Sequence, residues 1–226
     1  MARVIVLDLD DTLYLERDYQ LSGFAAAGLH LAATRAIDGL EIVAARLFRE
    51  GVRLRVYDEA LEAMEIRDAT LVRELVEVHR GHRPAISLLP DAGRFLERAR
   101  LQGLELALLS DGLLVAQRNK VAALRLEHVL DPIVLTDVWG RERWKPSEHG
   151  FREIMSALGG APSGYVYVAD NPAKDFLAPN RLGWGTIRVR RADGEHFIAE
   201  SGGGFSAPRL EVATLDDLDP ASLPAS

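Results

Sequence analysis

The sequence contains no cysteine, no long apolar run and no block of basic residues. Without cysteine, disulfide bonds, thiolate chemistry and cysteine-ligated zinc are excluded. No segment approaches the roughly 20 apolar residues needed to cross a bilayer. The apolar run at the beginning of the chain is too short for a signal sequence. We therefore expect no membrane association and a cytoplasmic location.

The chain also has fewer basic than acidic residues, with 27 Lys and Arg residues against 34 Asp and Glu residues and a net charge of −7. A nucleic-acid polymer is not an expected partner, because nothing in the chain provides a basic surface for its phosphate backbone. The 226 residues are 48% hydrophobic and 27% charged, a composition typical of a globular protein. One domain with a smaller insert fits this length.

Short, β-branched-rich runs that are apolar on both faces recur along the chain, and helical patterns separate most of them. The runs span residues 4–9, 104–109, 133–135, 165–169 and 186–189, and the helical patterns span residues 91–100, 113–126 and 151–158. Strands covered by helices on both sides have this pattern. The sequence therefore predicts an α/β fold built on a doubly wound, mostly parallel sheet.

Residues 15–83 differ, because they contain no convincing strand. Apolar residues recur there at helical spacing within residues 24–31, 42–48, 60–66 and 71–78. We expect a small all-helical cap of four or five helices, inserted into a catalytic core formed by residues 1–14 and 84–226. The region after Gly194 is expected to form a loop, a short edge element within residues 210–218 and a frayed terminus.

The first predicted strand ends in Asp8-Leu9-Asp10-Asp11-Thr12. Side chains alternate along a strand, so Asp8 and Asp10 can project to the same side. Two carboxylates this close repel unless a cation or a proton lies between them. The alternative is a solvated turn at the strand end, in which Thr12 caps a helix.

Two further motifs place polar groups near strand ends or helix starts. Ser110-Asp111-Gly112 follows an apolar strand and precedes a helical pattern, so the Ser110 hydroxyl suits a phosphate oxygen or a plain helix cap. Lys145 precedes Pro146 and a helical pattern, where it either clamps an anion or lies solvated on the surface.

The fourth motif, residues 170–176, follows another apolar strand. Asn171-Pro172 favours a turn after Asp170 that brings Asp175 back toward the strand end. Taken alone, this segment is equally well explained as a solvated loop. Carboxyl ends of strands in open α/β sheets meet at one edge, where ligands bind. The four motifs together therefore predict one site there.

With these four motifs the sequence resembles the phosphatases of the haloacid dehalogenase superfamily over essentially its whole length. The resemblance implies a phosphomonoester hydrolase in which Asp8 is the nucleophile and becomes transiently phosphorylated, and Asp10 is the general acid and base. It implies that Ser110, Asp111 and Lys145 bind the substrate phosphate. It also implies a Mg²⁺ cofactor held by Asp8, Asp10, Asp170 and Asp175, with the Asp10 backbone carbonyl as its donor.

Two positions depart from the family pattern, with Ala169 where glycine is common and Asp111 where asparagine is common. Asp111 adds negative charge beside a phosphate. A phosphomutase would keep the same residues, and an inactive binding protein is a further alternative. The expected partner is a small phosphorylated metabolite of unknown identity, and the oligomeric state is open. By position alone, the candidates to face the substrate are Arg17, Tyr19, Gln20, Arg80, His82 and Arg83.

Overall fold

The computed structural model describes residues 3–223. It contains a six-stranded sheet in the order β3-β2-β1-β4-β5-β6, and every strand pair is parallel. The strands are β1 (Val4–Leu7), β2 (Glu105–Ser110), β3 (Ile133–Leu135), β4 (Tyr165–Ala169), β5 (Gly185–Val189) and β6 (Leu210–Val212). The α/β fold class predicted from the sequence is confirmed.

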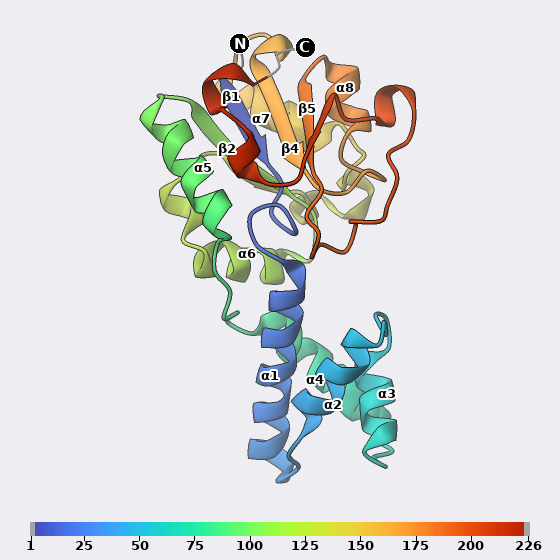
Figure 1. The fold of residues 1–226 in the computed structure, drawn as a ribbon. Helices are drawn as coiled ribbons and strands as arrows, with labels where there is room; N and C mark the ends of the chain where they lie inside the picture. The colour runs from blue at the N-terminus through green and yellow to red at the C-terminus, as the bar shows by residue number, and fades with distance from the viewer. Residues whose placement is uncertain (1–2, 224–226) are drawn as a thin grey trace.

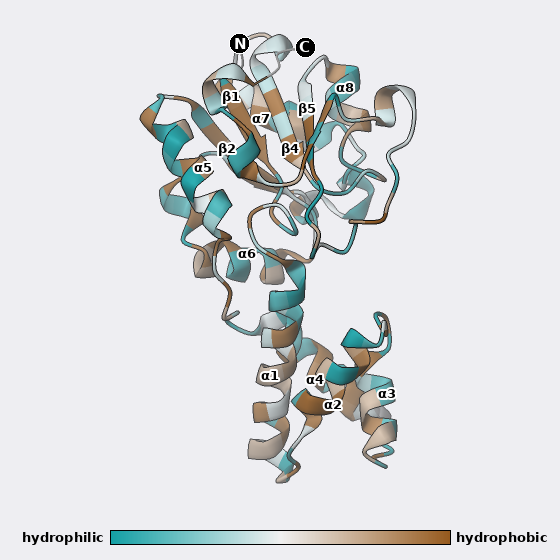
Figure 2. Cartoon of the chain, in the orientation of Figure 1, coloured by the Kyte–Doolittle hydropathy of each residue, from teal (hydrophilic) through white to brown (hydrophobic). Residues whose placement is uncertain are grey.

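Alternate side chains of the strands pack into two separate cores, one on each face of the sheet. Ile5 and Leu7 contact a core that includes Phe95 of α5 (Pro90–Leu101) and Val121 of α6 (Leu114–Ala123). The opposite core contains Val6 and residues of α7 (His149–Leu158) and α8 (Leu177–Leu182). Figure 2 shows the strands largely in brown, as expected for strands buried on both faces.

The four α-helices that precede α5 form a helical unit with its own hydrophobic core. They are α1 (Glu16–Arg35), α2 (Leu40–Arg49), α3 (Val56–Ala63) and α4 (Ala69–Gly81). Phe24, Phe48 and Tyr57 meet edge to face in this core. The unit projects from the end of the sheet at which β1 points, and its first helix begins just beyond the β1 loop (Figure 1). A cluster of apolar residues thus stabilises this unit apart from the sheet.

One predicted helix was wrong in its bounds. The pattern over residues 60–66 suggested a helix, but α3 ends at Ala63. Glu65 adopts a φ of 58°, in the left-handed region that terminates helices, and the Ile66 N–H then donates to the Leu61 carbonyl. Ile66 still packs against the core of the helical unit, so its apolar side chain indicated packing against that core but not a helical conformation.

The predicted ends of the core segments, residues 1–2 and 224–226, lie outside the described residues. The expected edge element is present as β6, which pairs with β5. Among the described helices, none is both long enough and apolar enough to cross a membrane.

Candidate active site

The strand order places two acidic strand ends side by side. Strands β1 and β4 are neighbours, with Leu7 opposite Val168, and the Asp8 N–H donates to the Val168 carbonyl at 2.9 Å. Asp170 directly follows β4, so it lies beside Asp8 at the carboxyl edge of the sheet. Ser110, the last residue of β2, is at the same edge on the other side of β1.

Three buried carboxylates converge at this edge. Oxygens of Asp8, Asp170 and Asp175 all lie within 4.8 Å of one another. The turn after β4 returns Asp175 to the strand end, because its Oδ2 accepts the Asn171 N–H at 2.9 Å. Opposite ligands of a bound Mg²⁺ are about 4 Å apart, so this donor set matches a small divalent cation.

Burial and the charge of neighbouring carboxylates make Asp8 and Asp170 harder to ionise, because both effects raise the pKa of each. Burial raises the pKa of Asp8 to about 6. Burial together with the charges of Asp175 and Asp8 raises the pKa of Asp170 well above its usual range. Hard carboxylate oxygens held close together in this way fit a divalent metal ion, which would relieve both effects.

Lys145 lies against this cluster and is itself buried. Its Nζ is 2.9 Å from Asp8 Oδ1 and 2.8 Å from Asp175 Oδ1, and it donates to the Tyr167 hydroxyl at 2.8 Å. Burial acts to lower the pKa of Lys145, but Asp175 and Asp8 outweigh burial and raise it well above its usual value. Lys145 is therefore a fixed cation beside the Asp8 carboxylate.

The Ser110-Asp111 pair lies at the same edge, but its local structure differs from the expectation of a helix start. Helix α6 begins at Leu114, whose N–H is accepted by Asp137 at 2.9 Å. Ser110 is buried, and its hydroxyl contacts the Asp111 carbonyl at 3.4 Å. Within residues 3–223, Ser110 thus caps no helix, and its hydroxyl has only this long, weak contact with a protein group.

The Asp111 carboxylate is occupied by protein donors. Its Oδ1 accepts from the Thr136 hydroxyl at 2.7 Å and from the Lys145 N–H at 3.1 Å. Its Oδ2 lies 3.3 Å from Lys174 Nζ. Asp111, the acidic residue that departs from the family pattern, therefore has the Lys174 cation nearby. Its hydrogen bond from the Lys145 N–H also joins the second motif to the third.

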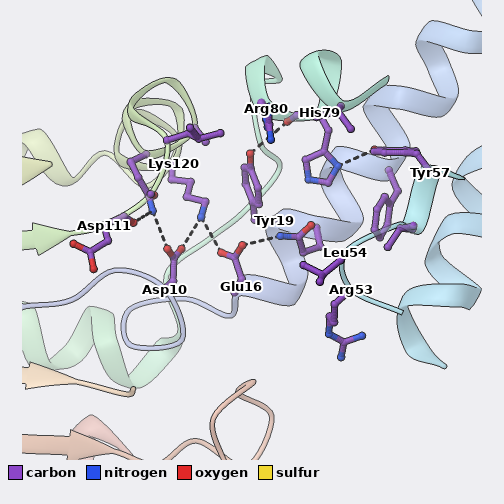
Figure 3. A pocket seen from close by; sticks show the side chains of 18 of the residues that line it. Asp10, Glu16, Tyr19, Arg53, Leu54, Tyr57, His79, Arg80, Asp111 and Lys120 are labelled. Carbon is purple, nitrogen blue, oxygen red and sulfur yellow. Dashed lines mark hydrogen bonds and ion pairs between the residues drawn. The ribbon is translucent and has the colours of Figure 1, made fainter. Parts of the chain in front are cut away.

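Asp10 belongs to a second cluster, away from the three converging carboxylates. The Tyr14 hydroxyl and Lys120 Nζ donate to its Oδ1, the latter at 2.7 Å, and Gln117 donates to its Oδ2 at 2.9 Å. Lys120 also pairs with Glu16 at 2.8 Å. Figure 3 shows Lys120 between the two carboxylates. The carboxylates of Asp8 and Asp10 are thus each paired with a different lysine.

The two carboxylates on Lys120 differ in their pKa. Burial acts to raise the pKa of Asp10, but Lys120 and several hydrogen bonds hold it well below its usual range. Burial and the neighbouring Asp10 charge raise the pKa of Glu16 to about 8. The Asp10 carboxylate is therefore the more strongly stabilised anion of the pair.

A cavity of about 380 Å³ opens next to this second cluster. The core contributes Asp10, Asp111 and Lys120 to its lining, and the helical unit contributes residues that include Tyr57 and His79 (Figure 3). Of the residues proposed by position, only Tyr19, Gln20 and Arg80 line it. Arg17 instead pairs with Asp193, and His82 bonds Ser22.

Some residues that shape the site were not identified from the sequence. Lys120 and Gln117 lie three residues apart in α6, a spacing that places them on one helix face, but nothing in the sequence indicated what that face contacts. Lys174 was within the fourth motif without a role. Arg188 reads as part of an apolar strand, yet its buried guanidinium donates to the Asp170 carbonyl at 3.1 Å.

Comparisons with known proteins identify the family to which the sequence is similar. A family model described as haloacid dehalogenase-like hydrolase matches residues 2–183. A phosphoserine phosphatase of Thermus thermophilus is 36% identical over 194 residues, which cover 83% of this chain and 71% of the relative. A glyceraldehyde 3-phosphate phosphatase of Methanothermobacter thermautotrophicus is 25% identical over 232 residues, covering 96% and 97%.

Solved structures share the fold at low sequence identity. A magnesium-bound HAD-hydrolase, YfnB, from Bacillus subtilis superposes with a TM-score of 0.64 and 15% identity, covering 96% of each chain. The L-2-haloacid dehalogenase of Xanthobacter autotrophicus has a TM-score of 0.61 and 20% identity, covering 98% of each chain. With the family model extending over most of its length, this chain belongs to the haloacid dehalogenase-like hydrolases.

Proposed function

We propose that this protein is a magnesium-dependent phosphomonoester hydrolase that acts on a small phosphorylated metabolite through an aspartyl phosphate on Asp8. The observation that supports this most directly is the buried Asp8 carboxylate beside Lys145, Asp170 and Asp175 at the sheet edge. Relatives named as phosphatases over most of the chain support the same reaction class.

In this proposal Asp8 attacks phosphorus in line, and the ester oxygen leaves from the opposite side. Lys145 keeps the carboxylate oriented through its 2.9 Å contact and offsets negative charge as it spreads over the phosphoryl oxygens. Ser110 and Asp111 complete phosphate binding. Because the Asp111 carboxylate already holds Thr136 and Lys174, its backbone N–H is the group proposed to contact the phosphate.

The carboxylates of Asp8, Asp170 and Asp175, with the Asp10 backbone carbonyl, are proposed to hold Mg²⁺. When bound, the ion would neutralise phosphate charge and so favour the approach of an anionic nucleophile. The Asp10 side chain, on the cavity wall, is proposed to enter the reaction protonated and to give its proton to the leaving oxygen, which produces the carboxylate anion that Lys120 stabilises. This anion then takes a proton from the attacking water and returns to its starting state, a contribution of about 10²–10⁴ in rate.

Residues 15–83 are proposed to act as a cap over a core formed by residues 1–14 and 84–226. The cavity supports this, because its walls come from both parts. Closure of the cap would exclude water while the aspartyl phosphate forms. The relatives carry different substrate names, so the metabolite is best sought among small phosphorylated acids, sugars and nucleoside monophosphates.

The test is release of inorganic phosphate from 4-nitrophenyl phosphate and a panel of these metabolites, with Mg²⁺ or with excess chelator. We expect activity only with the metal. Asp8→Asn should lose at least about 10⁴-fold in kcat, because an amide is neither a comparable nucleophile nor an anionic ligand. The matched control is Asp38→Asn, which changes an exposed carboxylate in the helical unit and should be fully active.

Undiminished turnover in chelator, or full activity of Asp8→Asn, would contradict the proposal. Trapping of acid-stable phosphate on the wild-type protein but not on Asp8→Asn would test the intermediate directly. Transfer of the phosphoryl group to a second position of a sugar phosphate, without release of phosphate, would indicate a phosphomutase instead.

A further inference from the structure

Helix α6 presents two adjacent polar side chains, those of Asn119 and Lys120, to the segments on either side of the helical unit. Lys120 pairs with Glu16, the first residue of α1, at 2.8 Å. Asn119 donates to the carbonyls of Gly81 and His82, where α4 ends, at 3.1 and 2.9 Å. The same helix therefore contacts the chain both where it enters the helical unit and where it leaves.

Lys120 and a further α6 residue, Gln117, hold Asp10. Lys120 donates to one carboxylate oxygen at 2.7 Å, and Gln117 donates to the other at 2.9 Å. Tyr14 adds a further donor to the first oxygen. Because donors from two directions engage both oxygens, the rotation of the Asp10 carboxylate about its side-chain bonds is restricted.

This restriction sets the direction in which Asp10 acts. Asp10 and Lys120 both line the cavity, whereas Asp8 is buried and pairs with Lys145. The Lys120 side chain is only 4% exposed, and both of its ion-pair partners are protein carboxylates. It is thus placed to orient Asp10 rather than to bind the substrate phosphate.

We propose that Lys120 is a positioning residue that fixes the Asp10 carboxylate toward the leaving group and, through Glu16, links that position to the start of the helical unit. The inference rests on the proposed function, because it requires Asp10 to be the acid and base. Its chemical consequence is specific. A misplaced acid slows the departure of an alkoxide, which needs a proton, far more than that of 4-nitrophenolate, which leaves without one.

The experiment compares single-turnover cleavage of 4-nitrophenyl phosphate with cleavage of the best alkyl phosphate of the metabolite panel, in the full-length protein with Mg²⁺. Lys120→Met should slow alkyl cleavage at least about tenfold more than aryl cleavage. Lys120→Arg, which keeps a cationic donor, should recover a large part of this selective loss. Arg118→Met, on an exposed position of the same helix, is the control and should leave the ratio unchanged.

A general loss of structure would lower both rates together, so equal losses on the two substrates would overturn the proposal, as would no loss at all. A raised KM with unchanged single-turnover rates would make Lys120 a substrate-binding residue and would also overturn it. If Lys120→Met does not fold, Gln117→Leu carries the test, because it removes the donor to the other Asp10 oxygen and should give the same selective loss.

Asp10→Asn separates this inference from the proposed function. If Asp10→Asn shows the selective loss on alkyl phosphates and Lys120→Met does not, only the role of Lys120 fails. If Asp10→Asn itself shows no selective loss, Asp10 is not the acid, and the mechanism under the proposed function fails with it.

Discussion

Two buried lysines, Lys145 and Lys120, each pair with two carboxylates, and no carboxylate is shared between these two lysines. The surroundings of the carboxylates differ. The side chains of Asp8 and Asp175, on Lys145, are 4% and 0% exposed, whereas those of Asp10 and Glu16, on Lys120, are 28% and 24% exposed. The first cluster is closed and the second faces the cavity.

The clusters also differ in what holds them. The Lys145 cluster is built on the ends of paired strands, whose relative positions are fixed by the ladder between β1 and β4. The Lys120 cluster joins α6 to the beginning of α1, so it spans the junction between the sheet and the helical unit. A cluster anchored on paired strands thus lies beside a cluster whose geometry depends on the position of that unit.

The largest expected difference between the Lys145 and Lys120 clusters is in their effect on the rate of phosphate-ester cleavage. Lys145→Met should lower single-turnover cleavage of aryl and alkyl phosphates equally, by about 10²–10³-fold, because a cation beside the attacking carboxylate serves every leaving group. The alkyl-to-aryl ratio of Lys120→Met, measured in parallel, provides the contrast. A loss in Lys145→Met confined to alkyl phosphates would erase the distinction between the two lysines.

The next effect is on stability and its dependence on metal. Lys145→Met leaves Asp8 and Asp175 buried without their cation, which should lower the free energy of unfolding by about 3–5 kcal/mol in chelator. Added Mg²⁺ should recover part of this loss by binding only the folded state. Urea unfolding with and without Mg²⁺ measures both values.

The matched comparison for this stability effect is Lys120→Met, because Lys120 pairs with the partly buried carboxylates of Asp10 and Glu16, which lie outside the convergent cluster of Asp8, Asp170 and Asp175. Its unfolding free energy should respond to Mg²⁺ as the wild-type value does. An equal recovery by Mg²⁺ in both variants would place the metal elsewhere than at Asp8, Asp170 and Asp175.

The strand-end cluster was predictable because short-range pattern and topology coincide there. Apolar runs that end in Asp8 and Asp170 indicate parallel strands, and parallel strands bring their carboxyl ends to one edge. The return of Asp175 followed from the Asn171-Pro172 turn, which the structure contains. That these residues are catalytic or bind metal stays a prediction until the variants are assayed.

The Lys120 cluster was not predictable in the same way. Lys120 and Glu16 are 104 positions apart, and their contact depends on how α6 packs against the start of α1. In sequence, a lysine in a helix indicates a solvated face. Helix bounds failed for a similar reason at α3, where the left-handed Glu65 ended a segment whose apolar spacing continued.

A third prediction concerns His79, which lies in the helical unit near the Lys120 cluster. The Lys120 ammonium lies 4.2 Å from the centre of the Tyr19 ring, and Tyr19 packs against His79. Burial, aided by the charges of His82 and Lys120, lowers the pKa of His79 to about 4, from 6.5. Only the unfolded chain gains this proton as pH falls from about 6.5 to about 4. The contribution of neutral His79 to the free energy of unfolding is therefore complete above pH 6.5. It is lost as the pH falls from about 6.5 to about 4, by up to about 3 kcal/mol.

The measurement is urea unfolding between about pH 7.5 and pH 4.5, in steps of about half a pH unit. His79→Gln should show a smaller decrease in unfolding free energy than the wild-type protein, and His128→Gln, at an exposed position, should follow the wild type. Asp8 acts in the opposite direction, because its raised pKa favours the folded state as pH falls. The difference between variants cancels that contribution. Identical pH dependence of His79→Gln and wild type would refute the assignment.

The smallest expected effect is at the exposed contacts between the helical unit and the turn at residues 192–195. Arg17 of α1 pairs with Asp193 at 2.9 Å, but the two side chains are 43% and 65% exposed. Water and salt screen such a pair, so Arg17→Ala should change the unfolding free energy by about 0–1 kcal/mol, and less at high salt. A double-mutant cycle with Asp193→Ala measures the coupling, and the Arg46–Glu50 pair at the end of α2 is the reference. A coupling of about 3 kcal/mol, the scale of a broken buried pair, would mean that surface charges fix the helical unit as firmly as the buried lysines fix the carboxylates.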